Sequence, residues 1–268
     1  MRLTEIRTDA RAVAVARIGL GVATVFNAVE AFAILDRIRG GLLAMPVFDA
    51  APRVETPLLA AWLMVAVAAG IALAIGWLTT PAAIVTVALN VAILLWDEQV
   101  YSSHRWLATL LVAYLAFARS DTTWSITHRR SDATVPWWPQ LLMMSQLSVL
   151  YLFSALSKMN PYFITGAPLS KWVWLDLPWQ LFFIASVLTV GVELFIAIGL
   201  WFRASRRLAA LLGLGLHASI VVLMNNETFA LIAFAITCVS LYPLFLRRPS
   251  LRHRDEIRPT AEQLSSSG

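Results

Sequence analysis

The sequence has little of what soluble proteins rely on. Of its 268 residues only 14% are charged, whereas a soluble globular domain carries about a quarter charged residues. It also has a single cysteine, Cys238, which excludes an intramolecular disulfide framework and any cysteine-based zinc or iron–sulfur site. Apolar residues make up 59% of the chain, and this composition indicates an integral membrane protein rather than a soluble or disordered one.

Motifs for metal, phosphate and acyl chemistry are missing as well. The four histidines show neither His-x-x-x-His nor Glu-x-x-His spacing, so we expect no metal site. There is no glycine-rich phosphate loop and no Gly-x-Ser-x-Gly nucleophile motif, and the usual nucleotide-dependent and serine-hydrolase classes are therefore excluded.

Long apolar runs fill most of the chain. A membrane-spanning helix needs roughly 20 mostly apolar residues, and eight runs approach that length. They lie near residues 12–35, 57–77, 80–97, 104–119, 137–158, 179–202, 207–224 and 228–246, the fourth being the shortest. The expected fold class is all-α, a polytopic helical bundle of about eight transmembrane helices over residues 1–248. The polar segment 249–268 is expected to be a disordered cytoplasmic tail.

The basic residues predict the orientation of the bundle. With the N-terminus inside, 15 of the 21 lysines and arginines fall in cytoplasmic segments, as the positive-inside rule requires. The net charge of +5 is thus an orientation signal, and we expect the lipid bilayer rather than nucleic acid as the partner. The outer segments 36–56 and 159–178 are candidates for interfacial caps, with Trp172, Trp174 and Trp179 where an aromatic belt is expected.

Lys158 is the leading candidate for chemistry, because ionisable groups at membrane depth are costly. It closes an apolar run just before Met159-Asn160-Pro161, and proline disfavours helix at the preceding residue, so the helix should end near Asn160. Ser148, Tyr151, Ser154 and Lys158 follow offsets of 3, 3 and 4, which places them on one helical face. A desolvated amine can serve as a general base. The alternative is a lysine that only anchors the helix at the interface.

Other polar residues lie inside the expected spans. His217 is in mid-span and Asn225 follows eight positions later; this histidine is either a hydrogen-bond donor or proton relay to a ligand, or a helix-packing residue. His104 lies at an outer boundary and either faces the same compartment as Lys158 or is a solvated loop residue. Buried pairing that fixes helix packing is the favoured interpretation for four further residues, Arg17, Asn27, Glu30 and Glu193.

A family resemblance rests on residues 151–166, Tyr-Leu-Phe-Ser-Ala-Leu-Ser-Lys-Met-Asn-Pro-Tyr-Phe-Ile-Thr-Gly. This stretch resembles the lysine-centred segment of the HTTM family, the membrane domain shared with vitamin K-dependent gamma-carboxylases. The segments 102–106 and 120–125 and the opening Arg17-Ile-Gly-Leu-Gly are similar to further family motifs in the same order. Glu193, His217 and Phe229 also fall where bacterial members carry an acid, a histidine and a phenylalanine. The resemblance covers most of residues 12–246.

The resemblance implies an activity and its residues. In the carboxylases the matching lysine is the base that deprotonates reduced vitamin K, so Lys158 would be the catalytic base. Four residues would bind or orient the quinone: His104, His217, Tyr151 and Asn225. The implied cofactor is a reduced quinone, the hydroquinone of vitamin K or menaquinone, without a metal. The implied substrate is a secreted peptide or protein, and the implied location is a bacterial plasma membrane.

The sequence departs from the family pattern in two places. Phe163 stands where the family has tryptophan, and Ser103 where the carboxylases have asparagine before the histidine. The chain also stops soon after the last span, so we expect it to lack the carboxylases' large extracytoplasmic domain. The alternative function is a non-catalytic membrane partner in maturation or export of a secreted peptide. A solute transporter that uses Glu30 and Glu193 is a further alternative.

Overall fold

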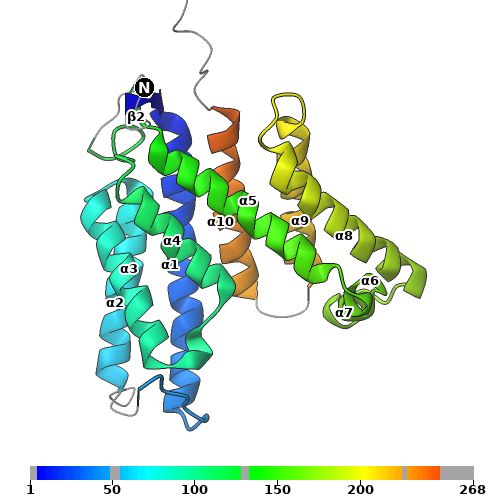
Figure 1. Ribbon diagram of the computed structural model, residues 1–268. Helices are drawn as coiled ribbons and strands as arrows, with labels where there is room; N and C mark the ends of the chain where they lie inside the picture. Colours follow the sequence, from blue (N-terminus) through cyan, green and yellow to red (C-terminus); the bar gives the residue numbers. More distant parts are fainter. Residues whose placement is uncertain (1–4, 49–54, 128–132, 225–227, 248–268) are drawn as a thin grey trace, which may run out of the picture.

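The computed structural model describes residues 5–48, 55–127, 133–224 and 228–247. Within these ranges the fold is all-α, as predicted, and most of it consists of long helices (Figure 1). The long helices are α1 (Ala10–Arg39), α2 (Thr56–Ile75), α3 (Thr79–Trp96), α4 (Ser103–Leu115), α5 (Trp138–Lys158), α8 (Trp179–Gly199), α9 (Arg206–Leu223) and α10 (Thr228–Leu246). Short elements are the 3₁₀ turn η2 (Glu98–Val100), the helices α6 (Pro161–Ile164) and α7 (Ala167–Trp172), and the antiparallel strands β1 (Arg7–Asp9) and β2 (Thr134–Pro136).

The fourth expected span is shorter than the sequence suggested. In the described residues, seven of the long helices are long and apolar enough to cross a membrane. The helix α4 has 13 residues and is only about 20 Å long, less than the ~30 Å hydrocarbon core. It ends at Leu115 because residues 116–127 form turns, which the buried Arg17 holds through hydrogen bonds to the carbonyls of Ser120 and Trp124 (2.9 and 2.5 Å).

The start of α1 and the end of α10 lie at the same end of the bundle. Thr8 Oγ1 donates to the carbonyl of Arg247 (3.1 Å), and the Arg247 guanidinium pairs with Asp9 (2.8 Å). The two ends of the bundle therefore meet, as a topology with both ends on one side requires. That this end faces the cytoplasm stays a prediction from the arginine count.

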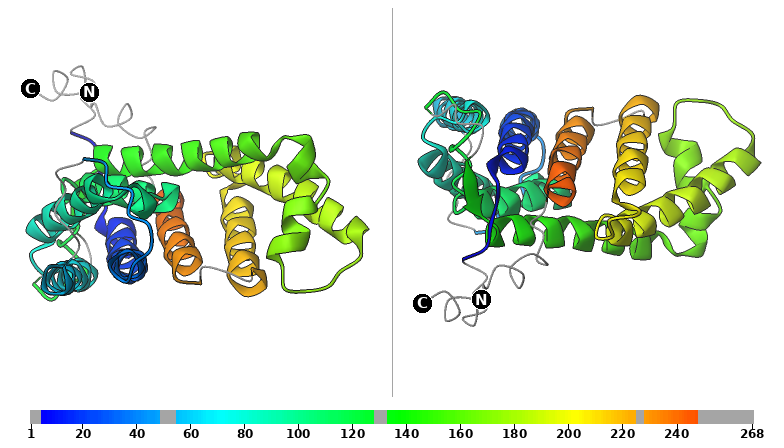
Figure 2. Two further views of the ribbon diagram at one scale, coloured as in Figure 1. Left: turned by 90° about the horizontal axis from the view of Figure 1, so that it is seen from below. Right: turned by 90° about the horizontal axis from the view of Figure 1, so that it is seen from above.

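The oblique helix α5 runs along a row of helices (Figure 2). Helix α1 packs against α2, α4 and α10, α9 packs against both α10 and α8, and α5 contacts α4, α10 and α8. Small residues allow a close approach of α1 and α2, where a Cβ at Gly21 would lie 2.5 Å from the backbone nitrogen of Ala74. Such contacts are typical of helices packed within membranes.

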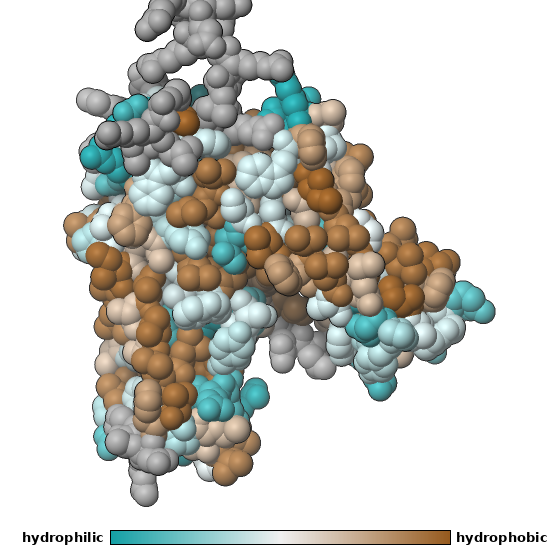
Figure 3. Space-filling view, in the orientation of Figure 1, coloured by the Kyte–Doolittle hydropathy of each residue, from teal (hydrophilic) through white to brown (hydrophobic). Residues whose placement is uncertain are grey.

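The flanks of the bundle are hydrophobic. Large apolar side chains there are exposed, for example Met64, Leu211 and Phe153, and brown side chains cover much of the sides while hydrophilic ones gather towards the ends (Figure 3). A soluble protein would bury such a surface. The chain is a multi-pass integral membrane protein whose flanks contact lipid.

Candidate functional site

The position of Lys158 is fixed by the end of α5. The helix stops at this residue, and the next short helix, α6, begins with Asn160 as its cap, whose side chain accepts from the Phe163 amide (2.9 Å). Proline at position 161 opens α6. The sequence therefore predicted this boundary to within two residues, and the expected interfacial cap over 159–178 contains the helices α6 and α7.

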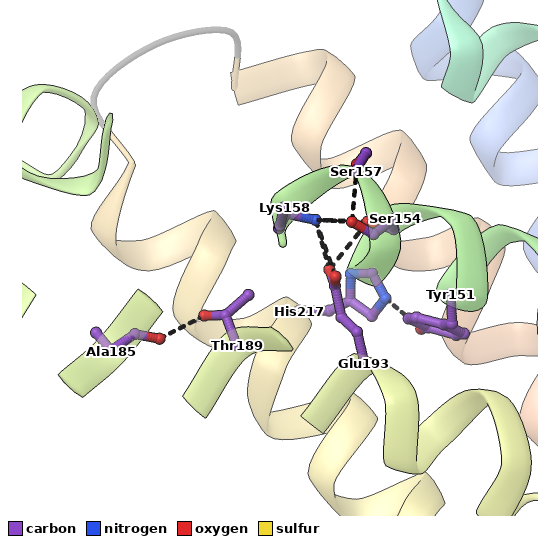
Figure 4. Close-up of polar contacts among 8 residues, drawn as sticks. All are labelled: Tyr151, Ser154, Ser157, Lys158, Ala185, Thr189, Glu193 and His217. Carbon is purple, nitrogen blue, oxygen red and sulfur yellow. Dashed lines mark hydrogen bonds and ion pairs between the residues drawn. The ribbon is translucent and has the colours of Figure 1, made fainter. Parts of the chain in front are cut away.

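Lys158 forms an ion pair with Glu193 of α8. Its Nζ lies 2.8 and 2.9 Å from the two carboxylate oxygens and also donates to the Ser154 hydroxyl, which in turn donates to Glu193 (3.1 Å) (Figure 4). Glu193 is buried, with 7% of its side chain exposed, and Lys158 is 24% exposed. The three side chains thus form one polar cluster between α5 and α8.

This polar cluster forms one wall of a cavity of about 220 Å³. The α8 residues Ala185, Thr189 and Glu193 line it at helical spacing, and Phe163 lies with its ring centre 5.9 Å from the lysine Nζ. The other lining residues come from α7, α9, α10 and the residues just after α7 and α9. They are Leu169, Trp172, Val173, Leu216, Ser219, Ile220, Leu223, Met224 and Phe234. Such an apolar cavity with one ionic wall suits a largely apolar ligand that carries a polar group.

A second hydrogen-bonded group lies beside the cavity. Tyr151 of α5 bonds through its hydroxyl to His217 Nε2 of α9 (2.7 Å) and to the Tyr242 hydroxyl of α10 (2.6 Å), and all three residues are buried. Neither Tyr151 nor His217 lines the cavity, but the His217 ring packs edge-on against Phe234, which does (5.3 Å between ring centres). The two predicted residues therefore support the wall rather than form it.

His104 lies elsewhere. It is on the first turn of α4, where its Nε2 is 3.1 Å from Glu30 of α1, and the buried Arg105 guanidinium contacts the same carboxylate (3.1 Å). His104 is not among the residues that line the cavity beside Lys158. His104 pairs with Glu30 instead, so the contacts of the described residues do not bring His104 and Lys158 into one site.

The remaining predicted residues are spread over the bundle. Arg17 holds the turns after α4, and Asn27 is buried on α1. Asn225 lies outside the described residues. In the part of the chain that the structure describes, no three His, Cys, Asp or Glu side chains come close enough to hold a metal ion.

The sequence indicates both Lys158 and Glu193 as buried polar candidates but does not predict their contact. The two residues are 35 positions apart, and the only signal that could have joined them is that a buried acid and a buried amine each require a partner. Ser154 was placed correctly on the Lys158 face by its helical spacing.

Residues 6–249 match the family model described as the HTTM domain, which covers nearly the whole chain. No solved structure matches the chain.

Proposed function

The chain belongs to the HTTM domain family, a membrane domain related to the vitamin K-dependent carboxylase, and on this premise we propose that it is a quinone-dependent membrane enzyme. The Lys158–Glu193 pair removes a proton from a reduced quinone of the vitamin K or menaquinone type. The site lies where α5 meets α6 and α7, away from the start of α1 (Figure 1) and towards the outer face in the predicted orientation.

The observation that carries this proposal is an amine and a carboxylate in contact on the wall of an apolar cavity. The pair shares one proton, which lies either on Nζ or on the carboxylate. It can accept a second proton, and then Nζ is an ammonium and Glu193 is a carboxylic acid. After the transfer the Nζ ammonium attracts the quinone oxygen that has lost its proton, and this attraction is strong where the effective dielectric constant is low. The cluster is thus suited to take a proton from a weakly acidic hydroxyl.

The cavity also fits the proposed cofactor. Its aliphatic and aromatic lining suits a flat quinone ring, while Ser154 orients both members of the ion pair. When bound, the reduced quinone would supply the electrons and the site at which oxygen reacts. The protein's own residues bind the ring, exclude water and hold the proton.

The test is formation of quinone epoxide by the purified protein in lipid. The assay supplies reduced menaquinone or vitamin K, oxygen, bicarbonate and a glutamate-rich peptide, with mass spectrometry of the quinone. We expect epoxide from the native chain and a loss of about 100-fold or more in Lys158→Ala, as for removal of a general base. Lys171→Ala is the matched control, because Lys171 is the second of the two lysines in the sequence, and it should retain activity.

The alternative function gives the opposite result. A non-catalytic membrane partner in maturation or export of a secreted peptide would produce no epoxide above the Lys158→Ala background, although the native chain is folded. It would tolerate the Lys158 substitution in a maturation assay.

A further inference from the structure

A second pocket lies on the other side of Val173 from the Lys158 cavity. It has a volume of about 340 Å³ and is formed by the segment between α7 and α8 together with the first turn of α8. Trp174, Asp176 and Trp179 line it. Its other lining residues are Ser170, Val173, Leu175, Leu177 and Phe182, of which Val173 lines both cavities.

The chemistry of this pocket is that of a cation site. Two indoles and a phenyl ring offer electron-rich faces, which attract ammonium groups. Asp176 is the single ionisable residue among the lining residues, and in the described part of the chain it takes part in no ion pair. Asp176 is exposed, as are Trp174 and Trp179 beside it. A carboxylate without a cation partner next to aromatic rings favours a positively charged ligand over an anionic or neutral one.

The tryptophan wall is held in place by the protein itself. The Trp174 amide donates to the carbonyl of Leu223 (3.1 Å), its indole Nε1 donates to the carbonyl of Val222 (2.9 Å), and Val173 forms a β-bridge with Met224. A tryptophan of an interfacial belt usually directs its N–H to headgroups or water. The indole N–H of Trp174 already has a hydrogen-bond acceptor within the protein. Trp174 is therefore a fixed wall of the pocket rather than an anchor to lipid headgroups.

We propose that this pocket binds an ammonium group at the outer face, through Asp176 and the rings of Trp174 and Trp179. The ligand is a primary or quaternary amine, either a free amine or the headgroup of a lipid. The proposal does not depend on the quinone chemistry, since its residues, apart from Val173, are separate from those of the Lys158 cavity.

The experiment titrates the full chain in phosphatidylglycerol nanodiscs, whose lipid carries no ammonium group, with tetramethylammonium and with ethanolamine. Binding is followed by tryptophan fluorescence and by saturation-transfer NMR of the probe, with neopentyl alcohol as the neutral probe of similar shape. We expect saturable binding of both amines, none of the alcohol, and affinity for the amines weakened by about fivefold or more in Asp176→Asn. Glu98→Gln, an exposed acid in the 3₁₀ turn η2, is the matched control and should bind as the native chain does.

Equal binding by Asp176→Asn and the native chain, or equal binding of the neutral alcohol, would overturn the proposal. Thermal unfolding of the variant shows that it is folded. A second arm repeats the titration in phosphatidylethanolamine nanodiscs. If amine binding weakens there, the lipid headgroup occupies the pocket; if it is unchanged, the ligand is a free amine.

Discussion

At the scale of single residues, the hydrogen bonds beside the cavity depend on a close approach of α9 and α10 at Gly213. A Cβ at this position would overlap the Tyr242 hydroxyl, which bonds to Tyr151 and through it to His217. Glycine is therefore required here for space rather than for backbone freedom. Gly215, two positions further along α9, has no heavy atom within 4 Å of such a Cβ.

The two glycines give a matched pair of variants. We expect Gly213→Ala to lower the free energy of unfolding by about 1–3 kcal/mol, as overpacking does. Gly215→Ala should be neutral or slightly stabilising, because alanine is the better helix former. Unfolding of both variants in mixed micelles measures the difference. A Gly213→Ala protein as stable as Gly215→Ala would show that α9 and α10 are not packed as described.

At the scale of elements, one carboxylate joins α1 and α4 through ion pairs. Glu30 of α1 faces both Arg105, whose side chain is fully buried, and His104. Further along α1, Asp36 pairs with Arg39 on an exposed surface. The Glu30 pair is thus largely buried, whereas the Asp36 pair on the same helix is exposed.

Neutralising these two acids should have very different effects. Glu30→Gln leaves the Arg105 guanidinium without its counter-charge, and we expect a loss of about 2–3 kcal/mol in unfolding free energy. Asp36→Asn should cost less than about 0.5 kcal/mol, because an exposed pair contributes little. Equal losses in the two variants, measured by chemical denaturation, would contradict the buried pairing of α1 with α4.

The sequence predicted elements better than contacts between them. Apolar runs indicated the long helices, since length and hydropathy are local properties, and Asn160-Pro161 marked the end of α5. The early end of α4 was not predictable, because it involves Arg17, more than 100 positions from the carbonyls it binds. Helical spacing predicts that Ser154 lies beside Lys158, because the two residues are neighbours on one helix. The contacts of Glu193 with Lys158 and of His104 with Glu30 join different helices, so no local pattern predicts them.

At the scale of the whole molecule, the bundle is closed where its two ends meet. Asp9 caps α1 by accepting from the Arg11 amide (2.9 Å) and pairs with Arg247 after α10. Partial burial alone would raise the pKa of Asp9, but hydrogen bonds from Arg11 and Arg247 outweigh it and lower the pKa below its ordinary value of 3.8. The resulting stabilisation is complete above that ordinary value and is lost as the pH falls through the lower, folded-state value.

Asp9→Asn tests this closure. The amide keeps an acceptor for the helix cap but loses the charge, so we expect a small loss, about 0.5 kcal/mol, near neutral pH. The difference in melting temperature between native and variant should stay constant from pH 7 to 5 and shrink below about pH 4, where the native carboxylate takes up a proton. A difference that persists unchanged at pH 3 would show that the charge of Asp9 does not contribute.

The most direct test of the central claim measures the protonation state of a bound reduced quinone. Reduced menaquinone is bound anaerobically to the native chain, Lys158→Ala and Lys171→Ala in lipid nanodiscs at pH 7, and its absorbance spectrum is recorded. We expect an ionised hydroquinone in the native chain and in Lys171→Ala, and a fully protonated one in Lys158→Ala. The same protonated spectrum in all three proteins, with the quinone shown to be bound, would contradict a base at Lys158 and Glu193.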